Sequence, residues 1–358
     1  MKKNFRVIKS SENNLIVSLK EGKNLDILKI AQRGNASLQK EYETLLKLKK
    51  FSKVYNFFLP AVYTNKRIKS VLLKNKFHFF QKLQPGLTLS RLIQKGIIKS
   101  NKVRHMSETL VDVLITIMQE DFKNCVNEKP SELFRKLLMM EFQNLIKRPH
   151  LYFITSKSNL KIENKYYNKL ENSLNKILSK KNFLDLDKQD QFLVDLGHFN
   201  FHGENIIISD LKAVNKFKLI DPDTRWKILD PMFSMARYFY TYSHDTAEKK
   251  NYYIKSNIFD LKNTDKNFYF NTKILWSKEV DKVYKKMFDI NLVKKKINKF
   301  EKLRFNLSYL LCLMRGINSN YEEKITFFKN KGNLLQNNGI FFSLLAIKYA
   351  HQISYEEY

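Results

Sequence analysis

Residues 198–205 read HFNFHGEN, and this polar stretch decides the fold of the chain more than any other. It lies between two short segments rich in branched or aromatic residues, 191–194 and 205–209, and a third follows at 217–220. Their composition predicts three short strands. A second polar stretch, DPDTR, follows the third strand at residues 221–225. Because loops held by strands are where functional side chains gather, we expect the chemistry of this protein in these two loops.

The N-terminal part of the chain predicts a small antiparallel sheet. Short runs of branched residues at 5–8, 15–19 and 25–30 are separated by polar, turn-forming residues and predict a three-stranded meander. A second hairpin is predicted from residues 69–73 and 77–83. The sheet is therefore expected to have five strands, complete by residue 83.

One helix is predicted within this region, directly after the loop at residues 34–37. Three leucines repeat on one face of this helix, and Glu41 falls on the same face. The leucines are Leu38, Leu45 and Leu48. A carboxylate is costly to bury unless it has a cationic partner. Lys29 is a candidate partner, because it lies in the predicted third strand and faces opposite to Ile30.

The chain changes character after residues 84–86, where the sequence Gln-Pro-Gly predicts a hinge. Apolar residues then recur at helical spacing, and the chain reads as helical again from residue 233 to its end. The other predicted helices are 89–94, 103–119, 132–146 and 166–178. This order predicts a bilobal α+β protein with a strand-rich N-terminal lobe at residues 1–83 and a mainly helical C-terminal lobe at residues 84–358.

The chain has 358 residues and a formal net charge of +30. Its lysines are spread along the whole length together with many Asn, Ile, Phe and Tyr residues, a mixture that an AT-rich genome encodes. We therefore favour a compositional origin of the charge over a nucleic-acid partner. The positive excess also disfavours a cationic small molecule as substrate, so we expect a neutral or anionic one.

The cysteine content and the apolar runs indicate the cellular compartment. Cys125 and Cys312 are too few for a disulfide framework or a Cys-based zinc site. No apolar run approaches the ~20 residues that a membrane span requires, and no apolar signal core follows the N-terminus. We expect a soluble protein in a reducing compartment, the cytoplasm. Nothing in the sequence indicates an oligomeric state.

Several motifs occur in a fixed order along the chain. His198 and Asn205 match the His and Asn of H-G-D-x-x-x-x-N, and Asp221 matches the aspartate of an apolar strand that ends in I-D. Residues 230–236 match G-D-P-x-x-D-L-A, and residues 84–89 match a post-hinge P-G-x-x-L. On these motifs, about two thirds of the chain resembles the aminoglycoside and choline phosphotransferase family of the protein-kinase-like superfamily.

The resemblance implies a protein-kinase-like fold and an ATP- and Mg²⁺-dependent phosphotransferase. Its acceptor would be a hydroxyl group of a small molecule such as a sugar, an amino alcohol or a polyol. Lys29 would contact the α- and β-phosphates of ATP, oriented by Glu41. The backbone of Gln81 and Leu83 would meet the adenine edge.

The resemblance also implies a metal site. Asn205 and Asp221 would supply oxygen ligands, which Mg²⁺ prefers. Taken singly, each residue also fits a common structural use, since Asn can cap a turn and Asp-Pro can begin one. Their occurrence in the family order favours the functional interpretation.

One position departs from the family motif. Two residues after His198, where the family carries its catalytic aspartate, this chain has Asn200. A carboxamide cannot take a proton near neutral pH, and general-base assistance contributes typically ~10²–10⁴-fold. Either Asn200 positions the acceptor hydroxyl by a hydrogen bond, or another carboxylate is the base. Asp195 is the first candidate for that base, ahead of Asp223 and Glu204.

The departure leaves a second hypothesis open: a pseudokinase that binds nucleotide, or serves as a scaffold, with reduced or no turnover. The family's Gly-rich loop is also absent, since residues 10–14 contain no glycine, which argues only weakly against nucleotide binding. A third and weaker hypothesis is a nucleic-acid-associated protein, whose binding would fall steeply with salt.

Overall fold

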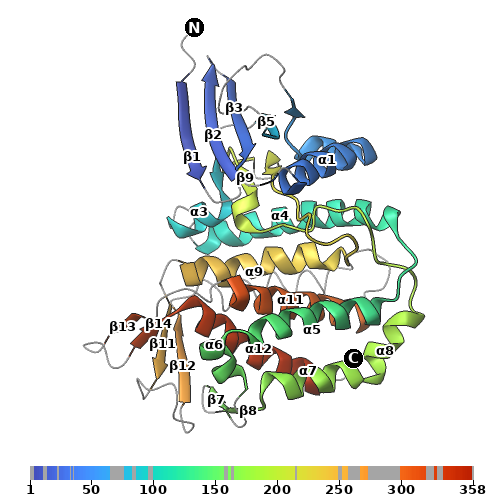
Figure 1. The fold of residues 1–358 in the computed structure, drawn as a ribbon, viewed down its shortest axis with the longest axis vertical. Coiled ribbons are helices and arrows are strands. Elements are labelled where there is room, and N and C mark those ends of the chain that lie inside the picture. Colours follow the sequence, from blue (N-terminus) through green and yellow to red (C-terminus); the bar gives the residue numbers. More distant parts are fainter. Residues whose placement is uncertain are drawn as a thin grey trace.

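A computed structural model describes the chain in segments. They are residues 4–10, 14–21, 24–32, 34, 36–64, 76–82, 86–95, 100–156, 160–162, 165–213, 216–248, 252–256, 267–272, 299–319, 326–328 and 334–356. Figure 1 shows two lobes: a small sheet with helices beside it, and a larger region of stacked helices beneath it. The predicted bilobal α+β architecture is confirmed.

The N-terminal lobe is built on a five-stranded antiparallel sheet, as predicted. Its strands are β1 (Asn4–Ser10), β2 (Asn14–Glu21), β3 (Asn24–Ala31), β4 (Val62–Tyr63) and β5 (His78–Lys82). The strand order is β1-β2-β3-β5-β4, so the predicted meander forms one half of the sheet. The expected strand at 69–73 lies outside the described residues, and β4 is the described partner of β5 on its outer side.

Helix α1 (Ala36–Phe51) lies beside this sheet and packs against β3, β4 and β5 (Figure 1). Its buried residues are Leu38, Glu41, Leu45 and Leu48, the face that the periodicity predicted. Lys29 pairs across the sheet with Phe79 and shares the α1 side with it, whereas Ile30 belongs to a small cluster on the opposite side. A second short helix, α2 (Lys53–Phe58), follows α1 and was not expected from the sequence.

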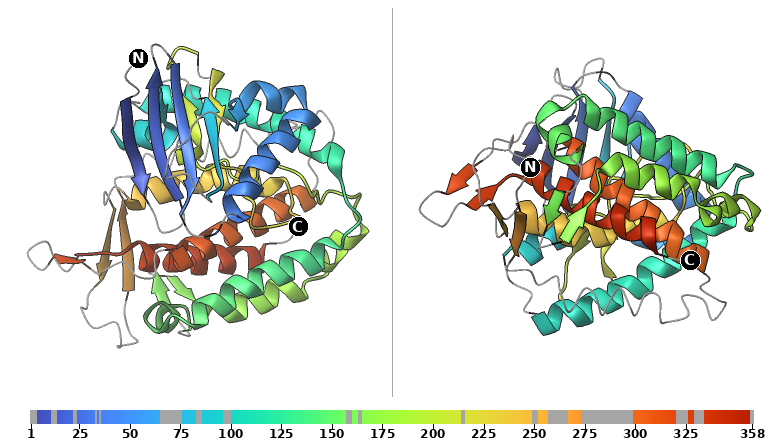
Figure 2. Two further views of the ribbon diagram at one scale, coloured as in Figure 1. Left: turned by 45° about the horizontal axis from the view of Figure 1, so that its top comes forward. Right: turned by 90° about the horizontal axis from the view of Figure 1, so that it is seen from below.

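The C-terminal lobe is a stack of helices around one apolar core. They are α3 (Leu89–Gln94), α4 (Ser100–Asp121), α5 (Pro130–Ile146), α6 (Pro149–Thr155), α7 (Leu170–Ser179), α8 (Lys181–Leu184), α9 (Met232–Glu248), α11 (Lys299–Ser319) and α12 (Asn338–Tyr355). Helix α11 packs against α5, α9 and α12, and α12 also packs against α7 (Figure 2). Apolar residues lie on most sides of α12, which explains its central position.

Three expectations about this lobe are wrong. Residues 191–194 form no strand, and only Val194 makes isolated bridges, to Cys125 and Leu229. The helix expected from residue 166 begins at Leu170, because the preceding residues pair as strands. Strands also interrupt the region expected to be helical after residue 233. These strands are β11 (Tyr252–Ser256), β12 (Asn267–Thr272), β13 (Thr326–Phe328) and β14 (Leu334–Gln336), and they form one sheet with β7 (Leu160–Ile162) and β8 (Lys165–Tyr167).

A small sheet between the lobes holds the two polar loops. Its strands are β6 (Leu87–Thr88), β9 (Ile206–Ile208) and β10 (Lys218–Leu219), in the order β10-β9-β6. Gly203 precedes β9, and a Cβ atom there would lie 2.3 Å from Thr241 of α9 and 2.5 Å from Ser90 of α3. The glycine therefore lets the loop pack closely between two helices. No helix in the described segments is long and apolar enough to cross a membrane.

Candidate functional site

Lys29, Glu41 and Asp221 meet at the junction of the two lobes. Lys29 Nζ donates to Glu41 Oε1 at 2.5 Å and also to Asp221 Oδ1. The side chains of Lys29 and Glu41 are 5% and 12% exposed, whereas that of Asp221 is 48% exposed. Strand β3, helix α1 and the loop after β10 each supply one group, and 192 residues separate Lys29 from Asp221. The predicted contact between Lys29 and Glu41 is present, and Lys29 also contacts Asp221.

The electrostatics of these three groups are coupled. Burial opposes the charge of Lys29, but the carboxylates of Asp221 and Glu41 outweigh it and raise the pKa of this lysine. Burial raises the pKa of Glu41 to about 7, although Lys29 acts in the opposite direction. The Lys29 ammonium lowers the pKa of Asp221 to about 2. Asp221 is therefore ionised at neutral pH and presents its exposed side to the space between the lobes.

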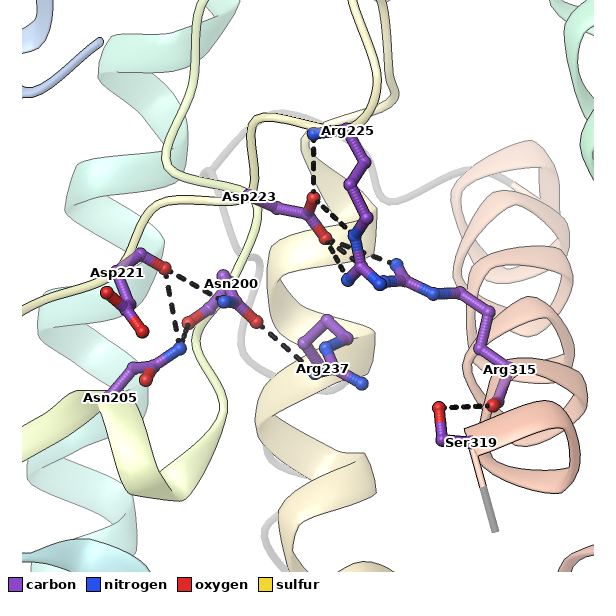
Figure 3. A network of polar contacts seen from close by, with 8 residues as sticks. All are labelled: Asn200, Asn205, Asp221, Asp223, Arg225, Arg237, Arg315 and Ser319. Carbon is purple, nitrogen blue, oxygen red and sulfur yellow. Dashed lines mark hydrogen bonds and ion pairs between the residues drawn. The ribbon is translucent and has the colours of Figure 1, made fainter. Parts of the chain in front are cut away.

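The loop around Asp221 has an unusual backbone conformation. Asp221 has φ 55° and Phe199 has φ 52°, both in the left-handed region that side-chain-bearing residues seldom adopt. The carbonyl of Asp221 accepts a hydrogen bond from Asn200 Nδ2 at 2.8 Å and a longer one from Asn205 Nδ2 at 3.4 Å (Figure 3). These two carboxamides hold the conformation that aims the Asp221 side chain at Lys29.

Asn200, at the position of the family's catalytic aspartate, uses both ends of its carboxamide. Besides the contact to Asp221, its Oδ1 accepts a hydrogen bond from Arg237 Nη2 of α9 at 3.2 Å (Figure 3). No carboxylate of the described residues pairs with Arg237. A cationic group therefore lies directly behind the residue that replaces the aspartate. The sequence analysis missed Arg237, although it follows directly on the motif at residues 230–236.

His198 is fully buried and lies behind the loop. Its backbone N–H donates to Tyr55 Oη at 3.1 Å, and Tyr55 Oη donates to Asp121 at 2.5 Å. Its carbonyl accepts from the N–H of Asp223 at 2.9 Å. Burial lowers the pKa of His198 to about 4, partly offset by Asp221. The imidazole is neutral at pH 7, and its position is that of a residue that organises the loop.

The pH dependence of stability should reveal this buried imidazole. The folded state favours the neutral ring of His198. The contribution of this ring to the free energy of unfolding is therefore fully present above its unfolded-state pKa of ~6.5 and is lost as the pH falls toward 4. The displacement corresponds to about 3 kcal/mol. We expect His198→Leu to lose less stability than the wild type between pH 6.5 and 4, as measured by urea unfolding at each pH. Parallel pH profiles would exclude His198 as the titrating group.

The other described residues predicted for the site do not contact the Lys29, Glu41 and Asp221 cluster. Gln81 is fully buried in β5, and neither atom of its carboxamide has a hydrogen-bond partner within the described residues. Leu83 lies outside the described residues. Asp195 is exposed and lines a neighbouring cavity of about 590 Å³, not the cavity that holds Lys29. Glu204 is exposed and lines neither cavity, so neither carboxylate faces Lys29.

Asp223 is held between two arginines that the sequence analysis did not identify. Arg225 donates to it through Nε at 3.0 Å and Nη2 at 2.7 Å, and Arg315 of α11 approaches its Oδ2 at 3.2 Å (Figure 3). The Asp223 side chain is 2% exposed. A carboxylate engaged in this way is poorly suited to act as a general base.

A cavity of about 280 Å³ opens over the cluster. Side chains of both lobes line it, and five of the candidate residues predicted from the sequence are among them: Lys29, Glu41, Asn200, Asp221 and Asp223. Its lining residues are Asn14, Ile16, Lys29, Ser37, Glu41, Asn200, Asp221, Pro222, Asp223, Thr224 and Arg225. The cavity thus brings together an ammonium group, several carboxylates and a carboxamide from both predicted polar loops.

The donor set at Asp221 suits Mg²⁺ bound together with phosphates. Mg²⁺ commonly takes one or two protein oxygen ligands and completes its shell with water and substrate phosphates. Asp221 offers an ionised, half-exposed carboxylate, and the Asn205 carboxamide lies beside it with its oxygen unused by any described hydrogen bond. The described residues contain no cluster of three or more His, Cys, Asp or Glu that could hold a metal without such help. The residues present therefore fit Mg²⁺ delivered with a polyphosphate.

Comparison with known proteins shows likeness in structure only. No protein-family model and no curated protein sequence matches the chain. Among solved structures, a candidate aminoglycoside phosphotransferase of Ralstonia eutropha superposes with a TM-score of 0.52 at 9% identity, covering 98% of this chain and 93% of that one. A thermostable mutant of aminoglycoside phosphotransferase APH(4)-Ia, in a ternary complex with ADP and hygromycin B, gives a TM-score of 0.50 at 12% identity, with the same coverage.

A crystal structure of aminoglycoside phosphotransferase APH(4)-Ia gives a TM-score of 0.50 at 11% identity, again over 98% of this chain and 93% of that one. At these identities the likeness concerns the fold. The chain has a protein-kinase-like fold of the type seen in aminoglycoside phosphotransferases.

Proposed function

We propose that this protein-kinase-like chain is an ATP- and Mg²⁺-dependent phosphotransferase that phosphorylates a hydroxyl group of a small molecule such as a sugar, an amino alcohol or a polyol. The observation that carries the proposal is the contact of Lys29 with both Glu41 and Asp221 on one cavity. A lysine between two carboxylates is suited to meet a phosphate chain and a cation together. The structural likeness to phosphotransferases supports the same class of reaction.

The N-terminal lobe would bind the nucleotide. Lys29 would contact the α- and β-phosphates, and Glu41 holds its ammonium from the α1 side. The Glu41 side chain is largely buried and is carried by α1, so the position of the Lys29 ammonium depends on the position of this helix. The backbone of Gln81 and Leu83 would meet the adenine edge.

The C-terminal lobe would supply the metal ligands and the reaction centre. Asp221 and Asn205 would hold Mg²⁺, which when bound neutralises phosphate charge. In the transfer, the acceptor oxygen bonds to the γ-phosphorus, the bond from this phosphorus to the β,γ-bridging oxygen breaks, and ADP leaves. Asn200 would position the acceptor hydroxyl. Because a carboxamide cannot take the hydroxyl proton, the proton leaves to water or to a phosphate oxygen.

The charged surroundings of Asn200 favour one type of acceptor charge. Arg237 lies 3.2 Å behind its amide oxygen and has no carboxylate partner among the described side chains. Together with the net charge of +30, this positive group favours a neutral or anionic acceptor over a cationic one. Cys125 and Cys312 are free thiols, which supports a reducing compartment such as the cytoplasm.

One observation favours a second candidate function, a nucleotide-binding pseudokinase. Both ends of the Asn200 carboxamide are engaged, with Asp221 and with Arg237, so the group is not free in this conformation to meet an acceptor. The two candidates share nucleotide binding and differ in turnover. Turnover therefore separates them.

Thermal unfolding with and without ATP and Mg²⁺ tests the shared part of the proposal. A ligand that binds the native state at 100-fold its Kd stabilises it by about 2.7 kcal/mol, so Tm should rise. Asp221→Ala should remove the Mg²⁺-dependent part of the rise, because the half-exposed carboxylate is the proposed ligand. Asp190→Ala is the matched control, since Asp190 is exposed and lines neither cavity.

A chain whose Tm does not respond to saturating ATP with Mg²⁺ would contradict both candidates. ATP consumption by the purified protein against a set of sugar, polyol and amino-alcohol acceptors then tests turnover. Consumption that depends on one acceptor class supports the phosphotransferase. Nucleotide binding with no consumption across the set supports the pseudokinase.

A further inference from the structure

The guanidinium of Arg225 lies on the same cavity as Lys29 but comes from the opposite lobe. Its backbone N–H and its Nε both donate to Asp223 Oδ1, at 3.1 and 3.0 Å, and its Nη2 donates to Oδ2 at 2.7 Å (Figure 3). The side chain is nevertheless 61% exposed. A two-point contact to one carboxylate fixes the plane of the guanidinium while one edge of it stays open.

Asp223 is itself fixed from the other side. Arg315 of α11 approaches Asp223 Oδ2 with both terminal nitrogens at 3.2 Å, and its guanidinium lies over the rings of Trp226 at 4.4 Å and Phe233 at 5.6 Å. Two cations therefore share one buried carboxylate. A second carboxylate, that of Glu141, also interacts electrostatically with Arg225, and burial raises the pKa of this glutamate. What these contacts leave for a ligand in the cavity is the open edge of an oriented guanidinium.

The cavity is small enough for one ligand to meet both cationic groups. Its volume of about 280 Å³ corresponds to on the order of ten water molecules of ~30 Å³ each. Lys29 of the N-terminal lobe and Arg225 of the C-terminal lobe both line it. The strand segment that would carry a Gly-rich loop, residues 10–14, contains no glycine, so a cradle of glycine amides is not available there.

We propose that Arg225 binds the terminal phosphoryl group of the nucleoside triphosphate and replaces the charge neutralisation that a Gly-rich loop provides elsewhere. The inference rests on the proposed function and assigns a specific residue to the γ-phosphate. An arginine is suited to this task because its planar fork contacts phosphate oxygens at two points. The negative charge on these oxygens must be stabilised during transfer, and a guanidinium already oriented by Asp223 needs no rearrangement to do so.

Calorimetric titration with Mg²⁺·AMP-PNP and Mg²⁺·ADP tests the assignment. The wild type should bind both, and Arg225→Gln should weaken AMP-PNP about 10- to 100-fold while ADP changes less than about twofold. The affinity of Arg225→Lys for AMP-PNP should lie between those of the wild type and Arg225→Gln, because lysine keeps the charge but lacks the planar fork of the guanidinium. Lys227→Gln is the matched control: it removes one charge two residues away, and Lys227 lines only the larger cavity.

The substitution should leave the fold intact, because Asp223 keeps Arg315 as its partner. An equal loss of AMP-PNP and ADP affinity in Arg225→Gln would overturn the γ-phosphate assignment, as would unchanged binding of both. The proposed nucleotide-binding function would survive either result. A wild type that binds neither nucleotide would overturn the proposed function and this assignment together.

Discussion

Lys29→Met should abolish the ATP-dependent rise in Tm and lower any turnover by ~10²–10³-fold, the loss typical of removing one preorganised donor from a reacting group. In the folded protein this ammonium lies between Glu41 and Asp221, so it contacts both lobes at the cavity. Without it, the two carboxylates would repel the phosphates. Calorimetric titration with Mg²⁺·ATP and an ATP-consumption assay measure the two effects.

The variant should still fold, because the two carboxyl groups can share a proton. Burial already raises the pKa of Glu41 to about 7 with the lysine present, and loss of the ammonium removes the opposing effect. A carboxyl group with a raised folded-state pKa contributes stability at low pH and loses it as the pH rises. We therefore expect the Tm of Lys29→Met to fall, relative to the wild type, from pH 7 upward.

Lys40→Met is the matched control for this prediction. Lys40 is an exposed residue of the same helix as Glu41 and lines the larger cavity. Its replacement removes the same charge without reaching the cluster. If Lys29→Met binds Mg²⁺·ATP as tightly as Lys40→Met does, the lysine has no role at a phosphate site, and the proposed function loses the observation that carries it.

Asn200→Asp should raise phosphoryl transfer, or background ATP hydrolysis, by up to the ~10²–10⁴-fold associated with general-base assistance. The structure can accommodate the change. The introduced carboxylate would accept from Arg237, which lies 3.2 Å from the present amide oxygen. The Asp221 carbonyl would lose one donor but keep Asn205 Nδ2, now at 3.4 Å. Nucleotide affinity should therefore stay within about threefold of the wild type.

Two further variants make this result interpretable. Asn124→Asp adds the same charge at a half-buried position on the larger cavity, and it should change neither binding nor hydrolysis. Asn200→Ala should slow a working enzyme, because the acceptor hydroxyl loses its hydrogen bond. A wild-type rate that Asn200→Ala leaves unchanged would show that another group does this work. Asp195, the first candidate from the sequence, would then be tested next, although it lines the larger cavity and not the one with Lys29. Asp223, the second candidate, is held by two arginines.

Local periodicity was sufficient to predict the first three strands, helix α1 and the contact between Lys29 and Glu41. A period of two places Lys29 and Ile30 on opposite faces of β3, and a period of 3.6 places Glu41 among the buried leucines of α1. Both side chains then lie between β3 and α1, where they contact each other. Short-range spacing decides these orientations, so the sequence alone determined them.

The same reasoning was wrong where strand and helix preferences compete. Residues 166 and 167 are apolar and aromatic, so they continue the helical pattern of α7, yet they pair with β7 in a sheet of six strands. Four of the strands of this sheet come from the region after α9. Strand pairing depends on partners far away in the chain, and a local pattern does not identify them.

The partners of the charged groups were decided only by the tertiary structure. The chain has 65 Lys and Arg residues against 35 Asp and Glu, so many cations are available to each carboxylate. Asp223 takes Arg315 from 92 residues away, and Asn200 takes Arg237 from 37 residues away. Ion pairing needs groups within a few ångströms and a suitable orientation, and sequence spacing specifies neither across such separations. The sequence by itself identified Lys29, Glu41, Asn200 and Asp221, which line the cavity. The packing of α9 and α11 against the loops decided that Arg237 and Arg315 lie behind them.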